Sequence, residues 1–99
     1  MKRIYLLLLL AATTGISLAQ TVTYAGHIAP IIYSHCTQCH RPGEIGPFPL
    51  TSYSEVKAQA GLVKYTTGIK YMPPWKADPN YQQYQKVNVL TNAEIQLIS

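Results

Sequence analysis

The chain has 99 residues and a formal net charge of +4 at pH 7, from eight lysine and arginine residues against four aspartate and glutamate residues. This length leaves room for one small domain. The basic residues are scattered singly, without the run or stripe that follows a phosphate backbone, so a nucleic-acid partner is not expected.

The first segment has the three parts of an export signal. Met1-Lys2-Arg3 is basic, residues 4–12 are mostly leucine, and Ser17-Leu18-Ala19 places small residues where a signal peptidase reads. The apolar run is shorter than the roughly 20 residues that a membrane span needs. We therefore predict cleavage of residues 1–19 and a periplasmic or extracellular domain over 20–99, with no membrane attachment after cleavage.

Three helical patterns follow, separated by long proline-rich loops, and strand patterns are scarce. In the first, apolar residues and a histidine recur with helical spacing and line one face: Ile28, Ile31, Ile32 and His35. Pro30 fits this helix only in its first turn, where a missing N–H costs no hydrogen bond. The sequence predicts that this helix leads directly into Cys36.

Capping boxes predict the starts of the other two helices. Ser52 and Glu55 open the second, which carries an apolar stripe of Val56, Ala60 and Val63 and which we expect to end at Gly68 as C-cap. The third begins at Thr91 and Glu94 and has only about two turns before the chain stops, which is marginal in water. We expect this C-terminal helix to be incomplete and the natural protein to continue beyond Ser99.

One short motif carries the chemistry. Cys36-Thr37-Gln38-Cys39-His40 has the C-x-x-C-H spacing of haem attachment sites. Two thiols separated by two residues can each form a thioether with one vinyl group of a porphyrin, and the adjacent histidine then lies beneath the iron. The motif predicts one covalent haem c (heme c), held through Cys36 and Cys39, with His40 as an axial ligand.

Two other kinds of site share part of this spacing. A thiol–disulfide pair of the thioredoxin kind expects a βαβ neighbourhood, whereas the flanks here are helical and rich in proline. A zinc site expects further ligands at a suitable distance, and His40 directly follows Cys39. The sequence therefore favours covalent haem over a thiol–disulfide pair or a zinc site.

The second axial ligand decides between electron transfer and small-molecule binding. Met72 precedes Pro73-Pro74, which favours extended backbone at Met72 and a polyproline conformation after it, so the thioether is displayed from a stiff loop. We predict that Met72 is the iron ligand, with His27 or an open site as alternatives. His35 is expected to be a partly buried structural histidine.

The surroundings of the haem offer further candidates. A ligating histidine normally donates its second ring N–H to a fixed acceptor, and backbone carbonyls near Pro47 and Pro49 are suitable. Arg41 and Trp75 both carry donors with the reach to bind haem propionates, so both are candidate cofactor-binding residues.

These motifs resemble those of small bacterial class I-like cytochrome c domains. The similarity covers nearly all of 20–99: His35 to Pro47, a capped helix over 52–67, Met72-Pro73-Pro74-Trp75 with Asp78 after it, and the helix start over 90–99. It implies an all-α small cytochrome c fold, with about three helices around a covalent haem, long proline-rich loops and a truncated last helix. In that family His40 and Met72 would be the axial ligands.

The resemblance implies an electron carrier rather than an enzyme, with redox partner proteins or a fused redox domain as partners. Alternatives are a haem-based sensor or peroxidase-like domain with an open distal site, an electron-donating module of a larger exported redox enzyme, and a thiol–disulfide module. Binding of carbon monoxide, the haem spectrum and titratable thiols separate these possibilities.

Overall fold

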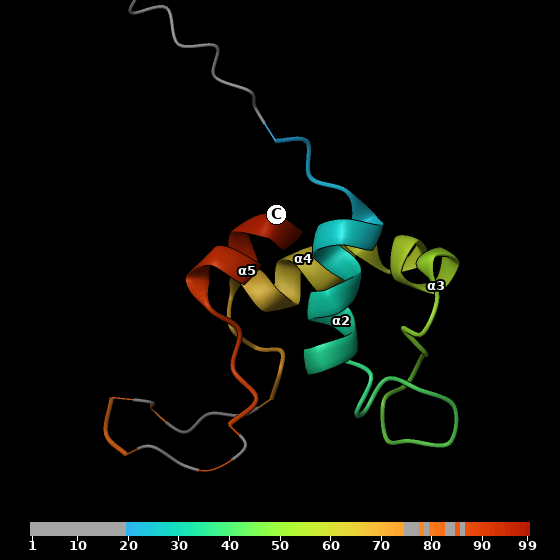
Figure 1. Cartoon of the computed structure of the whole chain (residues 1–99). Coiled ribbons are helices and arrows are strands. Elements are labelled where there is room, and N and C mark those ends of the chain that lie inside the picture. Colours follow the sequence, from blue (N-terminus) through green and yellow to red (C-terminus); the bar gives the residue numbers. More distant parts are fainter. Residues whose placement is uncertain (1–19, 75–77, 79, 83–84, 86) are drawn as a thin grey trace, which may run out of the picture.

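The computed structural model of the chain describes residues 20–74, 78, 80–82, 85 and 87–99. Within these ranges the structure is all-α and contains no strand. Figure 1 shows the helices gathered together, with the loop over 41–51 extending to one side of them. None of the described helices is both long enough and apolar enough to traverse a lipid bilayer. The predicted signal segment, residues 1–19, lies outside the described residues.

The first helical segment forms as the sequence predicts. A π-helical turn, η1 (Tyr24–Ile28), runs directly into α2 (Ala29–His35), and Pro30 occupies the first turn of α2. The face that packs inward carries three buried residues: Ala29, Ile31 and Ile32. Since Cys36 is the C-cap of this helix, the C-x-x-C-H motif begins where α2 ends.

The second segment is two helices rather than the single one predicted. α3 (Tyr53–Ala58) and α4 (Ala60–Gly68) are separated at Gln59, whose φ of −106° and ψ of 10° lie outside the helical range. Val56 and Val63 of the predicted stripe are buried in the core, whereas Ala60, which the sequence places in the same stripe, is exposed.

Both predicted capping boxes are present. The side chain of Ser52 accepts from the backbone N–H of Glu55 while the Glu55 carboxylate accepts from the backbone N–H of Ser52, and α3 begins at the next residue. Thr91 and Glu94 make the same reciprocal pair in front of α5 (Asn92–Ile98). Each box satisfies N–H groups that the first helical turn leaves without intrahelical acceptors.

The C-terminus of α4 differs from the expectation of a Gly68 cap. Gly68 is still helical, and the chain reverses two residues later at Lys70, whose φ is +57°. The N–H groups of Lys70 and Tyr71 donate to the carbonyl oxygens of Thr67 and Thr66, which is the hydrogen-bond pattern of a Schellman motif. A lysine therefore occupies the left-handed position that glycine usually takes.

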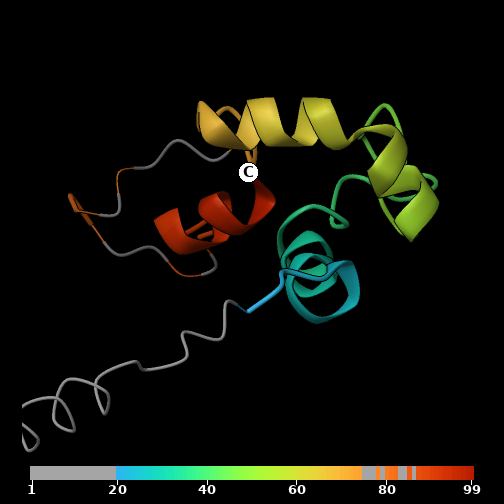
Figure 2. The same cartoon turned by 90° about the horizontal axis from the view of Figure 1, so that it is seen from above.

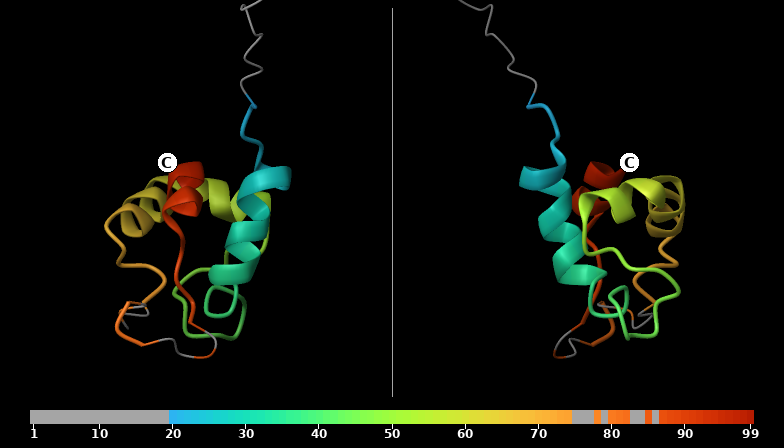
Figure 3. Two further views of the ribbon diagram at one scale, coloured as in Figure 1. Left: turned by 60° about the vertical axis from the view of Figure 1, so that its left-hand side comes forward. Right: turned by 90° about the vertical axis from the view of Figure 1, so that its right-hand side faces the viewer.

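The core lies between α2, α3 and α4. Its buried members come from these helices and from the loop before α3: Ile32, Leu50, Val56 and Val63. α5 lies alongside α4 and close to η1, so the last helix returns to the start of the described chain (Figures 2 and 3). Ile98 of α5 and Tyr24 of η1 both pack against this core.

Candidate functional site

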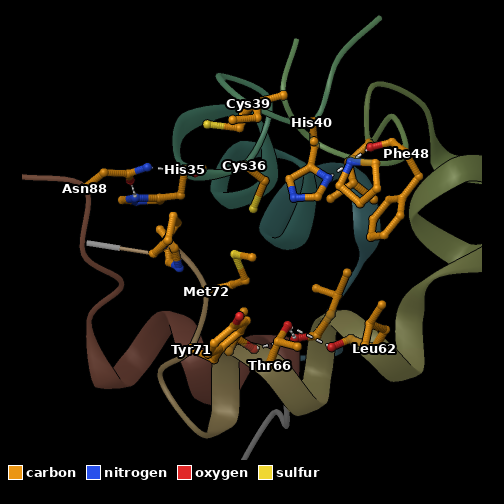
Figure 4. A pocket seen from close by; sticks show the side chains of 18 residues that line it. His35, Cys36, Cys39, His40, Phe48, Leu62, Thr66, Tyr71, Met72 and Asn88 are labelled. Carbon is orange, nitrogen blue, oxygen red and sulfur yellow. Dashed lines mark hydrogen bonds between the residues drawn. The ribbon is translucent and has the colours of Figure 1, made fainter. Parts of the chain in front are cut away.

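A cavity of about 400 Å³ opens beside the core, within the roughly 300–1,000 Å³ of small-molecule and cofactor sites. Its wall combines the end of α2 and the turn after it, the loop over 45–50, the second half of α4 with residues 71–74, and Asn88. Most lining side chains are apolar, and Figure 4 shows them around a common space. The cavity thus joins segments that are far apart in the sequence.

The two cysteines enter this cavity on one turn. The N–H of Cys36 donates to the carbonyl of Ile32 at 2.8 Å, and the N–H groups of Cys39 and His40 donate to the carbonyl of Cys36 at 3.2 and 2.9 Å. These bonds fold the motif tightly, so that Cys36, Cys39 and His40 all contribute to the lining on this side of the cavity. The sulfur atoms are not joined in a disulfide. Burial raises the pKa of the Cys36 thiol to about 11.

His40 has a fixed tautomer. Its Nδ1 atom lies 2.9 Å from the carbonyl oxygen of Phe48, and since a carbonyl can only accept, Nδ1 carries the hydrogen. The lone pair is therefore on Nε2, and Figure 4 shows the ring directed into the cavity. The acceptor lies between Pro47 and Pro49, which confirms the prediction that a carbonyl in this stretch binds the second ring nitrogen.

Gly46 brings this acceptor to His40, and the sequence analysis did not identify it. Its N–H donates to the carbonyl of Cys39 at 2.8 Å, and the N–H of Leu50 donates to the carbonyl of His40 at 2.8 Å. These two bonds fold the loop back over the motif. A β-carbon at position 46 would lie 2.5 Å from the Cys39 carbonyl oxygen, so only glycine permits this approach.

Met72 lies in the facing wall. The carbonyl oxygen of Thr66 accepts from the N–H groups of both Tyr71 and Met72, at 2.9 and 3.1 Å, so the chain reversal after α4 directs Met72 toward the cavity. Figure 4 shows its side chain across the cavity from Cys36 and His40. The Met72–Pro73 peptide bond is cis, a geometry that the sequence did not predict.

Two further candidates, His27 and Arg41, do not line the cavity. His27, the alternative iron ligand, is on η1, does not line the cavity, and accepts at Nδ1 from the N–H of Thr23 at 3.0 Å. Arg41 is exposed and pairs with Glu44 at 3.1 Å, away from the cavity lining. Trp75 lies outside the described residues. None of these three is placed in the site by the described part of the structure.

His35 is partly buried, as predicted, and its partners come from a segment 53 residues away. Its Nδ1 atom lies 2.6 Å from Oδ1 of Asn88, and Nδ2 of Asn88 donates to the carbonyl of His35 at 2.8 Å. Its Nε2 atom lies 3.3 Å from Oε1 of Glu94. No local signal in the sequence links either residue to the motif, so Asn88 was not predicted and Glu94 was predicted only as a helix cap.

The cavity gathers sulfur and nitrogen donors without forming a cluster of protein ligands for a bare ion. Among the residues that the structure describes, no three or more histidine, cysteine, aspartate or glutamate side chains are placed to hold a metal. Comparisons with family models, with curated proteins and with solved structures found no match to this chain.

Proposed function

We propose that this protein holds one covalent c-type haem in the cavity and transfers single electrons. The observation that carries the proposal is the placement of Cys36, Cys39 and His40 in one wall of an apolar cavity with Met72 in the facing wall. When bound, such a haem supplies the exchange of one electron between ferrous and ferric iron.

Each residue of the motif has a role that follows from its position. Cys36 and Cys39 would hold the porphyrin as thioethers, each formed by addition of its S–H group across one vinyl group. His40 would bind iron through Nε2, because Nδ1 is occupied by the carbonyl of Phe48. That second bond fixes the ring orientation and increases the basicity of the ligating nitrogen.

Met72 favours electron transfer over small-molecule chemistry. Its side chain lies in the cavity on a backbone held by the Thr66 carbonyl, so a thioether is already placed on the side opposite His40. A methionine ligand fills the distal position and raises the reduction potential. The mostly apolar lining would limit solvent access to the iron, which also affects its reduction potential.

The same arrangement supports a small cytochrome c fold. A motif at the end of one helix, a methionine after another and a returning last helix agree with the small cytochrome c fold that the sequence motifs resemble. On this proposal the protein is an exported electron carrier or an electron-transfer domain, and its partners are redox proteins or a fused redox domain. On the same proposal we assign it no catalytic residue.

The thiol–disulfide alternative fits the site less well. The first cysteine of such a module reacts as a thiolate and therefore needs a lowered pKa. Burial moves the pKa of Cys36 in the opposite direction, to about 11. The lining also brings in Met72 and an oriented His40, for which a thiol–disulfide reaction has no use.

The proposal is tested by expressing the full chain in a bacterium that matures c-type cytochromes. We expect the exported product to carry the mass of one haem and to give the absorption spectrum of a haem with two thioether links. The variant C36A should lose one link and C39A the other, while H27Q should behave like the unchanged chain. A colourless product at the bare peptide mass would contradict the proposal.

A further inference from the structure

His35 lies in the wall of the cavity between two hydrogen-bond acceptors. The orientation of the Asn88 amide is fixed, because its Nδ2 donates to the carbonyl of His35 at 2.8 Å. The atom that lies 2.6 Å from Nδ1 of His35 is therefore the amide oxygen, which can only accept. It follows that Nδ1 of His35 carries a hydrogen.

The other ring nitrogen of His35 faces a carboxylate. Nε2 lies 3.3 Å from Oε1 of Glu94, while Oε2 of Glu94 accepts from the N–H and hydroxyl of Thr91 at 2.7 and 2.8 Å. These bonds favour the ionised carboxylate. A neutral imidazole with its hydrogen on Nδ1 would present a lone pair to this oxygen, whereas an imidazolium donates to both partners.

We infer that Asn88 and Glu94 hold His35 as an imidazolium in the cavity wall, and that this ring couples proton binding to the oxidation state of the iron. The inference rests on the proposed haem site. A positive charge in the wall stabilises the electron-rich ferrous state, and because such coupling is reciprocal, loss of an electron weakens proton binding. Oxidation then sends one electron to a one-electron redox partner and one proton from His35 to water.

His35 and Asn88 both line the cavity, which places this charge close to the proposed cofactor. The side chain of His35 is 18% exposed, so solvent screens it only in part while a proton still has a route out. Besides carrying a charge, the ring also holds neighbouring segments in position. Through Asn88 and Glu94 it ties the end of α2 to the segment over 87–90 and to the start of α5.

The titratable groups that face the cavity with His35 are few in the described part of the chain. Glu94 faces the ring from α5, and Asn88, which does not titrate, faces it from the segment over 87–90. Three groups from the motif itself and one from the facing wall share the lining: Cys36, Cys39, His40 and Tyr71. On the proposed function the first three are occupied by the haem, and Tyr71 lies in the facing wall.

The test measures the protonation of the ring and the redox equilibrium of the haem-loaded protein. Nitrogen NMR of the reduced protein at pH 7 should show both ring nitrogens of His35 protonated. The electron affinity should fall as the pH rises, by up to about tenfold per pH unit for one linked proton. H35Q should lose this dependence, and H27Q, which alters a histidine away from the cavity, should retain it.

A second variant keeps the inference testable even if H35Q does not fold. E94Q keeps one side-chain oxygen, which can accept from Thr91, but removes the negative charge and the carboxylate acceptor that face Nε2 of His35, so the ring should bind its proton less tightly. A bare Nε2 on His35, a pH-independent electron affinity in the unchanged protein, or an undiminished dependence in H35Q would each overturn the coupling. A colourless chain overturns the proposed function itself, whereas a coloured chain without pH dependence overturns only this inference.

Discussion

Gly46 lies so close to His40 that a β-carbon at position 46 would be 2.9 Å from the Nδ1 atom of the imidazole. The Phe48 carbonyl reaches that same nitrogen only because the loop folds back here. We therefore expect G46A to displace the loop, weaken the His40–Phe48 bond and destabilise the protein by roughly 1–3 kcal/mol, as overpacking does. Chemical denaturation of the purified protein measures this loss.

Gly61 provides the matched control for this substitution. It lies in the first turn of α4, and a β-carbon there meets nothing within 4 Å. G61A should leave stability unchanged or raise it by about 0.5–1 kcal/mol, since alanine favours the helix. If G46A were as stable as G61A, the close approach at position 46 would not constrain the site.

Lys70 occupies the left-handed position that closes α4, with φ at +57°. A β-carbon is unfavourable in this conformation, and glycine has no such penalty. We expect K70G to stabilise the protein by roughly 0.5–1 kcal/mol. Glycine relieves the backbone strain at this position, and we expect this relief to outweigh the greater conformational entropy that glycine loses on folding. Thermal unfolding should show a higher midpoint.

K70A separates backbone strain from the loss of the lysine charge. Alanine removes the ammonium group but keeps the β-carbon, so K70A should resemble the unchanged protein or be slightly less stable. A gain in K70A equal to that in K70G would assign the effect to charge rather than to the left-handed backbone.

The features that the sequence predicted are those set by neighbours along the chain. Both capping boxes depend on a hydroxyl and a carboxylate three residues apart, and the acceptor for His40 lies only eight residues after it. The break at Gln59 was missed because Val56 and Val63 are spaced as on one continuous helix. The left-handed cap at Lys70 was missed because glycine is the usual residue at such a position, and Gly68 lies two residues earlier.

The missed parts of the site depend on tertiary structure. Asn88 binds His35 across 53 residues, and a lone asparagine in a loop carries no signal of its partner. Thr66 orients Met72 with its backbone carbonyl, which no side-chain pattern records. Gly46 was overlooked although it lies only six residues after His40, because its role is to let two backbone segments meet.

Acid should destabilise the protein through Glu94 and Glu55. The backbone N–H of Thr91 is the main cause that lowers the pKa of Glu94 below 4.5, and the side chain of Thr51 is the main cause for Glu55. A lowered folded pKa means that the stabilisation is present above the ordinary carboxyl pKa and is lost as pH falls through the folded value. The free energy of unfolding should therefore decrease as the pH falls below 4.5.

The variants E94Q and E55Q should each reduce this acid sensitivity, because the amide keeps the cap geometry but does not titrate. E44Q is the control: Glu44 pairs with Arg41 at an exposed site, where an ion pair contributes little. Denaturation curves at several pH values make the comparison. If E44Q reduced the acid sensitivity as much as E94Q does, the capping carboxylates would not be its source.

Met72 should determine the ligation state of the proposed haem, because its side chain is the sulfur group of the facing wall. We expect M72A to retain the covalent haem, to lower the reduction potential and to bind carbon monoxide rapidly in the reduced state, since the distal position would then be open.

L62A is the matched control, because Leu62 lines the same cavity but offers no ligating atom. It should loosen the packing and leave carbon monoxide binding slow. Rapid binding by the unchanged protein, or equal potentials in M72A and L62A, would remove Met72 from the ligand set and favour an open-site sensor over an electron carrier.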